Sequence, residues 1–213
     1  MSYEKDVKEM MRKGGQLPDK LGISIVKYFW LASPLSGTRK DNIPKFLRKI
    51  EVLRNFTDNE LRILSHYIHE RTFNDGESIF RQNDLGVGFY LIYSGHVDVV
   101  IEHDKSEGHS KDVVENSRLV VSLERYDYFG ELALLQKNSV RSATVIAKQN
   151  CTLLGLFQPD LEELQENYPV VATKLLQTVS LIIANRLYSI TKEVRRLKYK
   201  LSLYEREDQG EDE

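Results

Sequence analysis

The middle of the chain carries a series of short apolar segments bounded by turn residues, and this feature limits the possible folds most strongly. The segments are rich in Val, Ile, Tyr and Phe, and no helical pattern separates most of them. Such a series is typical of an antiparallel barrel or sandwich. Gly95 lies between two of the segments and is expected in a hairpin turn with a positive φ angle. The predicted strands cover residues 78–81, 88–92, 96–102, 119–123, 143–146 and 152–157.

Helical periodicity flanks this region on both sides. From residue 43 to 71, apolar residues recur at spacings of three and four, and Thr57 stands three residues before Glu60, as in a capping box. Two short helices are expected there, and a longer helical region with a break near Pro169 follows the strands. The fold class is therefore predicted to be mainly β with flanking helices. The predicted parts are an N-terminal helical extension at 1–42, the β-rich domain at 43–168, a C-terminal helix at 169–206 and an acidic tail at 207–213.

The N-terminal extension combines a charged segment with an apolar one. Residues 3–13 are expected to form a charged helix, and residues 21–35 carry the only tryptophan of the chain. The apolar stretch is too short for a membrane span and is interrupted by Lys27 and Pro34. It fits a helix packed on the main domain, or a surface that docks a partner or a membrane.

The C-terminal helical region contains an apolar seam with heptad spacing, alternately four and three residues. In a parallel coiled coil this seam places Glu193 opposite Lys198 of a second chain, and Lys200 opposite Glu205, both as pairs of opposite charge. A parallel homodimer is expected, and the alternative is a single helix packed on its own domain. The predicted dimer residues are Ile183, Leu187, Ile190, Val194, Leu197 and Leu201.

Composition excludes several classes of function. Lys and Arg number 30 and Asp and Glu number 32, so a formal net charge of −2 gives no global attraction to nucleic acid. Cys151 is the only cysteine, which excludes an intramolecular disulfide and a cysteine-based zinc site. No secretory signal precedes residue 20, so a cytoplasmic protein is expected. His66 and His69 lack a third ligand, and no motif for covalent catalysis occurs, so neither a metal site nor an enzyme is predicted.

The segment from Phe129 to Val145, FGELALLQKNSVRSATV, is the one that indicates chemistry. Gly130 permits an abrupt entry into a short helix, whose free N–H groups favour an anion. Arg141 follows Glu131 by ten residues and could hold the same anion with two parallel hydrogen bonds. Glu131 fits beside an anion only if the ligand offers a hydroxyl group, as a sugar next to a cyclic phosphate does. The alternative is a structural salt bridge between the two side chains.

This segment resembles the phosphate-binding cassette of the cyclic nucleotide-binding domain family, whose pattern is approximately F-G-E-(L/I)-A-L-(L/I), a variable turn, and R-(S/A/T)-A-x-V. Residues 76–80 and 89–97 are similar to two strands of that family. The resemblance implies a β-barrel of the jelly-roll type. It also implies cAMP as the ligand, with cGMP as an alternative, and a scaffold that keeps the fold but binds no nucleotide as a third reading.

The resemblance also implies roles for individual residues. Glu131 would bind the ribose 2′-hydroxyl, and Arg141 the exocyclic phosphate oxygens. Val120 and Val121 would line the base pocket. Backbone N–H groups and the Ser142 hydroxyl would complete the phosphate shell. Arg186 would lie near the ribose, and Thr191 would reach the base from the partner subunit. The complete predicted set is Gly130, Glu131, Leu132, Ala133, Arg141, Ser142, Ala143, Val120, Val121, Arg186 and Thr191.

Two positions depart from the family pattern. The turn at 83–88 reads Asn-Asp-Leu-Gly-Val-Gly where the family usually has Gly-Asp, and this change is expected to reshape a loop without touching the phosphate site. Ile190 stands where a threonine binds the adenine amino group in the bacterial activators, which leaves the choice between adenine and guanine open.

The expected function is that of a regulatory receptor. Ligand binding would close the cassette, shift the C-terminal helix and change the surface shown to an unknown protein effector. A transcription regulator that acts through a DNA-binding partner is the remaining alternative. Direct DNA binding is not expected, because the basic run at 195–200 fits a solvated helix face and only about ten residues follow the helix.

Overall fold

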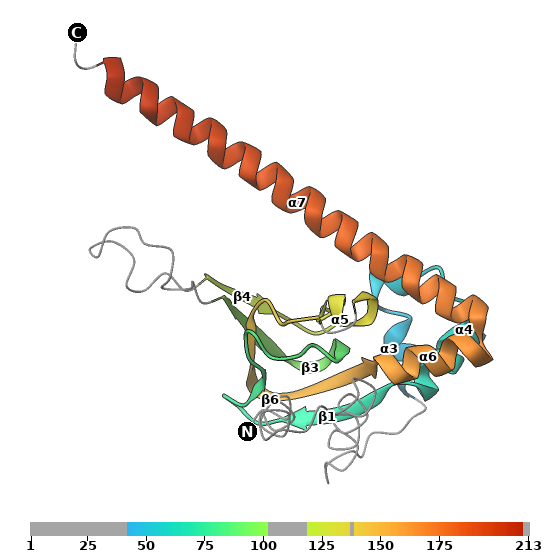
Figure 1. Ribbon diagram of the computed structural model, residues 1–213. Helices are drawn as coiled ribbons and strands as arrows, with labels where there is room; N and C mark the ends of the chain where they lie inside the picture. The colour runs from blue at the N-terminus through green and yellow to red at the C-terminus, as the bar shows by residue number, and fades with distance from the viewer. Residues whose placement is uncertain (1–41, 102–118, 137–138, 211–213) are drawn as a thin grey trace, which may run out of the picture. The chain divides into compact units, whose positions relative to one another are not determined.

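The computed structural model describes residues 42–101, 119–136 and 139–210 (Figure 1). The predictions for residues 3–13, 21–35 and the loop after residue 102 lie outside the described residues. The chain divides into two compact units, 1–174 and 175–213. The helices are α3 (Ile43–Leu47), the 3₁₀ helix η2 (Glu51–Leu53), α4 (Asp58–His66), α5 (Leu132–Leu135), α6 (Gln158–Asn167) and α7 (Pro169–Gly210). The strands are β1 (His69–Phe73), β2 (Ser78–Phe80), β3 (Gly88–Ile101), β4 (Leu119–Leu123), β5 (Tyr128–Phe129) and β6 (Thr144–Phe157).

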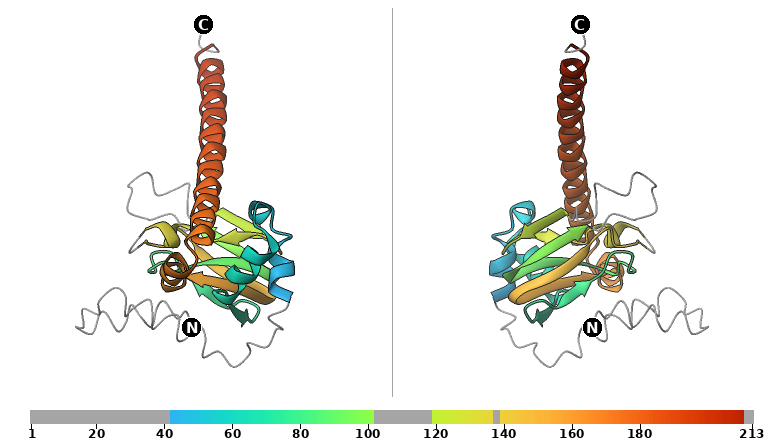
Figure 2. Two further views of the ribbon diagram at one scale, coloured as in Figure 1. Left: turned by 90° about the vertical axis from the view of Figure 1, so that its right-hand side faces the viewer. Right: turned by 90° about the vertical axis from the view of Figure 1, so that its left-hand side faces the viewer.

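The six strands form one antiparallel sheet, which confirms the predicted fold class. The order is β1-β6-β3-β4, with β2 paired to β6 and β5 paired to β3. The two long strands β3 and β6 run side by side from Gly88 opposite Phe157 to Val100 opposite Thr144 (Figures 1 and 2). Within the described residues the sheet does not close into a complete barrel, because β1 and β4 are its two end strands.

The turn predicted at Gly95 is absent, and this prediction was wrong in topology. Gly95 has the expected positive φ, +77°, but the chain continues through it as one strand, β3. The pairing with β6 shifts register between Ser94 and His96, so the glycine lies in a bulge rather than in a hairpin. A Cβ atom at Gly95 would lie 2.8 Å from the Cα of Cys151, so the close approach of β6 also requires glycine. The segments predicted at 143–146 and 152–157 are likewise one continuous strand, β6.

Two strands were missed by the sequence patterns. β1 lies where the helical pattern was extended to residue 71, and its buried residues Arg71 and Phe73 alternate as in a half-buried strand. β1 pairs with the second half of β6, where Phe73 lies opposite Cys151, 78 residues further along the chain. β5 has two residues, too few to produce a periodic signal.

The predicted helix signals are confirmed. The N–H of Glu60 donates to Thr57 Oγ1 at 3.3 Å, and the N–H of Thr57 donates to Glu60 Oε2 at 2.7 Å, which completes the capping box of α4. The helical region breaks between α6 and α7 at Tyr168 and Pro169, as predicted. α7 ends at Gly210, beyond the predicted end at residue 206.

A cluster of buried hydrophobic residues, most of them from the strands, forms the core. Cys151 is part of it, and burial raises the pKa of its thiol to about 12. The thiol is therefore protonated at neutral pH and inert, as expected for a structural cysteine. The fully enclosed members of the core are Phe73, Ile79, Phe80, Val87, Tyr90, Ile92, Val97, Phe129, Val145, Ala147, Cys151, Leu153 and Phe157.

The second unit consists of α7 from Leu175 onward. Five of the six predicted seam residues are exposed, with exposed fractions of 45–63%, and Ile183 is half-buried. Glu193 forms an ion pair of 2.6 Å with Arg196 on the same helix, which lowers the pKa of Glu193 and raises that of Arg196. Pro169–Tyr204 is long and apolar enough to cross a membrane, a property that core helices of soluble proteins share. The parallel dimer and the absence of a membrane span both stay predictions.

Candidate functional site

The cassette begins at Gly130, directly after β5. Gly130 has a φ angle of +79°, and a Cβ atom there would lie 2.7 Å from Nη1 of Arg141 and 2.8 Å from the carbonyl oxygen of Gly88. Both the backbone angle and the space therefore require glycine. Glu131 is the N-cap of α5, so the helix begins one residue later than predicted, at Leu132.

Two backbone N–H groups in the first turn of α5 donate to carbonyls at the start of the same turn. The N–H of Ala133 donates to the carbonyl of Gly130 at 3.2 Å, and the N–H of Leu134 donates to the carbonyl of Glu131 at 3.1 Å. Ala133 is completely buried, whereas Leu132 is exposed. The backbone N–H of Ala133 is therefore already engaged within the first turn of the helix.

Arg141 is fixed by three protein oxygens and two aromatic rings. Its Nη2 donates to the carbonyl of Gly88 at 3.1 Å and to Tyr90 Oη at 3.4 Å, and its Nη1 donates to the carbonyl of Gly130 at 3.4 Å. The guanidinium carbon lies 4.0 Å from the ring centre of Phe80, a cation–π contact that also restricts its orientation. The guanidinium is therefore oriented by core residues before any ligand arrives.

The loop at 83–88 contacts the segment that carries Arg141, which corrects the expectation that it would not touch the site. The N–H of Arg141 donates to the carbonyl of Asp84, and the N–H of Asn83 donates to the carbonyl of Arg141, both at 2.9 Å. The N–H of Gly86 donates to the carbonyl of Ser139 at 2.6 Å. The loop and the segment that carries Arg141 are more than 50 residues apart in the chain, so no local pattern shows that they meet. A short backbone pairing joins them around the bridge from Leu85 to Val140.

The two charged residues of the cassette are both buried. Glu131 and Arg141 each have an exposed fraction of 5%, and both adjoin Gly130, one through the chain and the other through a hydrogen bond. Burial of a carboxylate and a guanidinium is costly unless their charges are compensated. The structure therefore brings Gly130, Glu131 and Arg141 together.

The other residues predicted for the site lie just before β6 and on β4. Ser142 is exposed and Ala143 is buried immediately before β6. The pairing aligns Val121 with Val99 and Val145, two residues that pack in or against the core. Successive residues of a strand face opposite sides, so Val121 lies on the same side of the sheet as Val99 and Val145 and Val120 lies on the other, and both valines are exposed.

The predicted contacts from the C-terminal helix concern the second unit. Arg186 and Thr191 lie on α7, and both side chains are exposed. Their roles toward the ribose and the base stay predictions.

The partner of His69 was not apparent from the sequence. His69 Nε2 lies 2.9 Å from Asp160 Oδ1, although 91 residues separate them in the chain. Asp160 is almost completely buried, and its Oδ2 accepts the N–H of Phe157 at the start of α6. Among the described residues, no group of three His, Cys, Asp or Glu is placed to hold a metal ion.

The observed geometry defines a class of protein: an antiparallel β-domain in which a glycine turn, a short helix and a buried arginine converge. Residues 70–168 match the family model described as the cyclic nucleotide-binding domain. Among curated proteins, the cAMP-dependent protein kinase regulatory subunit of Dictyostelium discoideum is 40% identical over 101 residues, covering 47% of this chain and 29% of that protein. The cGMP-dependent protein kinase 2 of Homo sapiens is 30% identical over 112 residues, covering 53% of this chain and 14% of the kinase.

A solved structure agrees with this result. The catabolite activator protein of Thermus thermophilus has a TM-score of 0.56 and 28% identity, covering 69% of this chain and 62% of the other. Residues 70–168 thus belong to the cyclic nucleotide-binding domain family. The chain spans between 14% and 29% of the length of the two curated kinase-related proteins, so their whole activities do not transfer to it.

Proposed function

We propose that this chain is a non-catalytic, cytoplasmic regulatory protein that binds cAMP in the cassette and passes the signal to a protein effector through α7. The observation that carries the proposal is the buried Arg141, held over Phe80 by the carbonyl of Gly88, beside the positive-φ turn at Gly130. A fixed guanidinium suits the bidentate recognition of a phosphate, because little side-chain entropy is lost on binding.

The charges in the cassette favour a phosphate that carries a neighbouring hydroxyl. A cyclic phosphodiester has one negative charge, which Arg141 balances. Glu131 then needs a donor, and the ribose 2′-hydroxyl supplies one. A bare phosphate would place two negative groups together in a site from which water is largely excluded, where their repulsion is strong.

We propose cAMP as the ligand and keep cGMP as the alternative, because proteins named for each nucleotide are similar to this chain. The similar proteins include a cAMP-dependent protein kinase regulatory subunit and a cGMP-dependent protein kinase. Ser142, which is exposed next to the cassette arginine, is also compatible with cGMP bound in the syn form.

Isothermal titration calorimetry of the purified chain with cAMP and cGMP tests the proposal. We expect binding of cAMP, and Arg141→Ala should weaken it by a factor between about 30 and several thousand, which corresponds to ~2–5 kcal/mol for a buried charged contact. Arg125→Ala is the matched control, since Arg125 also lies over aromatic rings, 4.9 Å from the ring centre of Tyr126, but is exposed and outside the cassette. Absence of binding to either nucleotide would support the alternative of a scaffold that keeps the fold without a ligand.

Signalling through α7 is a separate part of the proposal. Cassette closure would shift the equilibrium of α7 and of a parallel dimer formed by its exposed seam. Hydrogen exchange with and without cAMP should show changed protection between Pro169 and Tyr204. Unchanged protection there would argue against this mechanism, and a DNA mobility-shift assay with the protein alone should show no complex.

A further inference from the structure

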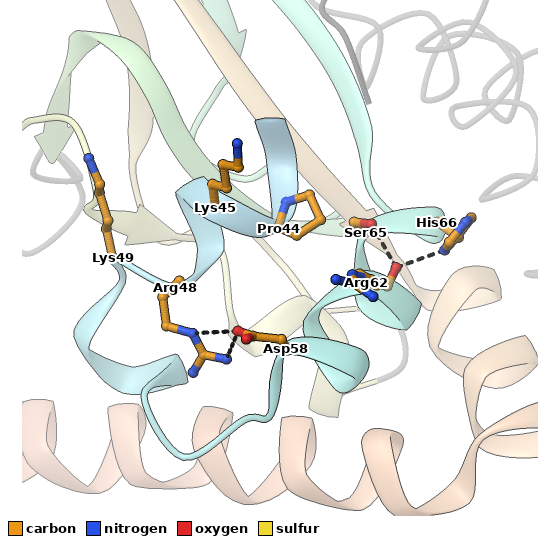
Figure 3. A pocket seen from close by; sticks show the side chains of 8 residues that line it. All are labelled: Pro44, Lys45, Arg48, Lys49, Asp58, Arg62, Ser65 and His66. Carbon is orange, nitrogen blue, oxygen red and sulfur yellow. Dashed lines mark hydrogen bonds and ion pairs between the residues drawn. The ribbon is translucent and has the colours of Figure 1, made fainter. Parts of the chain in front are cut away.

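A cavity lined by cations lies between α3 and α4, apart from the cassette. It measures about 590 Å³, within the range of roughly 300–1,000 Å³ that is typical of small-molecule sites. Four cationic side chains line it, and among the described residues Asp58 is the one carboxylate in the lining. The cations are Lys45, Arg48, Lys49 and Arg62 (Figure 3). We refer to it as the α3–α4 basic cavity.

Arg48 links the two helices beside this cavity. Arg48 donates through Nε to Asp58 Oδ1 at 3.2 Å, with a second bond from Nη2 to the same oxygen (Figure 3). Its Nη1 donates to the carbonyl of Phe56. These bonds join the end of α3 to the turn that precedes α4. The carboxylate is thereby neutralised by Arg48 and does not balance the other three cations.

Lys45, Lys49 and Arg62 are uncompensated. In the part of the chain that the structure describes, none of the three side chains forms a hydrogen bond or an ion pair. Lys45 and Lys49 are four residues apart on one continuous turn, where like charges repel each other. Three unbalanced cations in one hollow of a chain with a net charge of −2 produce a local positive potential that a concave surface concentrates.

The Ser65 and His66 side chains of the cavity bond to the backbone of their own helix. The Ser65 hydroxyl donates to the carbonyl of Arg62 at 2.6 Å, and His66 Nδ1 lies 2.7 Å from the same oxygen (Figure 3). The N-terminus of α4 is closed by its own capping box. Recognition in the cavity therefore depends on charge, and it favours a ligand with several negative charges over one with a specific shape.

We propose that the α3–α4 basic cavity binds a small soluble polyphosphate, a compact anion with two or more linked phosphate groups. Three cations, on α3, in the turn after it and on α4, match such an anion better than a single phosphate or a cyclic nucleotide, each of which offers fewer negative charges. This proposal is independent of the cassette: it holds or fails whether or not cAMP binds there.

Calorimetry with inorganic tripolyphosphate, pyrophosphate and phosphate tests the proposal at about 0.1 M salt, where charges are screened over about 10 Å. We expect affinity to rise with the number of phosphate groups, and saturating cAMP should not displace tripolyphosphate. The triple variant Lys45→Gln, Lys49→Gln, Arg62→Gln should lose at least about tenfold in affinity, since it removes three charge-assisted contacts. All three residues are exposed, so the fold should persist, which a thermal melt verifies.

A charge-matched control separates the cavity from the overall charge. The variant Arg54→Gln, Lys192→Gln, Arg195→Gln removes three cations that do not line the cavity, and its affinity should stay within about twofold of the unmodified chain. Equal losses in the two variants, or no binding of tripolyphosphate by the unmodified chain, would overturn the proposal. So would binding to phosphatidylcholine–phosphatidylserine vesicles or to DNA without binding of tripolyphosphate, because the partner would then be a membrane or a nucleic acid.

Discussion

Replacement of Gly130 by alanine should show whether the entry turn of the cassette and Arg141 act as one unit. The added methyl group would lie 2.7 Å from Arg141 Nη1 and 2.8 Å from the carbonyl oxygen of Gly88. The backbone oxygen cannot move without disturbing β3, whereas the guanidinium can swing away. The variant is therefore expected to lose both stability and the orientation of Arg141.

Gly76 supplies a matched control. Its φ angle, +75°, is close to the +79° of Gly130, but a Cβ atom there would meet nothing within 4 Å. Gly76→Ala should thus cost only the backbone strain, about 1–2 kcal/mol. Gly130→Ala should cost the same strain plus about 1–3 kcal/mol for overpacking.

Thermal unfolding and ligand titration measure the two effects. With ~2–4 °C per kcal/mol for a chain of this size, Gly76→Ala should lower the Tm by about 2–8 °C and Gly130→Ala by about 4–20 °C. Only Gly130→Ala should also weaken cAMP binding. The reasoning is refuted if both variants lose equal stability, or if Gly130→Ala binds cAMP as tightly as Gly76→Ala does.

Three further predictions concern regions outside the cassette. Lys174→Met should destabilise the chain by about 0.5–1 kcal/mol at neutral pH, because Lys174 Nζ lies 2.7 Å from Glu60 Oε1. That bond lowers the pKa of Glu60 below its usual 4.5. The stability difference between the variant and the unmodified chain should therefore be complete above pH 4.5 and shrink as the pH falls through the lowered pKa. Denaturant melts between neutral and acid pH should show this change, and a stability difference independent of pH would contradict it. The Cys151 thiol, with a pKa near 12, should resist an aromatic disulfide reagent at neutral pH until urea unfolds the chain, whereas immediate labelling of native protein would contradict its burial. Leu187→Lys should abolish the proposed dimer in analytical ultracentrifugation and Tyr188→Lys should not, since only Leu187 lies on the seam; a dimer that survives both changes would place the interface elsewhere.

Local patterns were informative where neighbouring residues settle the structure. The capping box at Thr57 and Glu60 and the abrupt helix entry at Gly130 were predictable because each depends on a few adjacent positions. Gly95 shows the limit of such patterns: its conformation was predicted correctly, but a positive φ fits both a hairpin and a bulge. The choice between them depends on whether β6 lies alongside without interruption, and residues far along the chain decide that.

The amino-acid sequence by itself determined the mainly β fold, the capped start of α4, the helix break before Pro169 and the cassette segment from Phe129 to Val145, because these features are encoded in local order and spacing. Tertiary structure alone decided which distant groups meet. It placed the carbonyl of Gly88 and the ring of Phe80 against Arg141, joined His69 to Asp160, and gathered Lys45, Lys49 and Arg62 around one cavity. The physical reason is that strand pairing and helix packing set distances between residues that no local periodicity records.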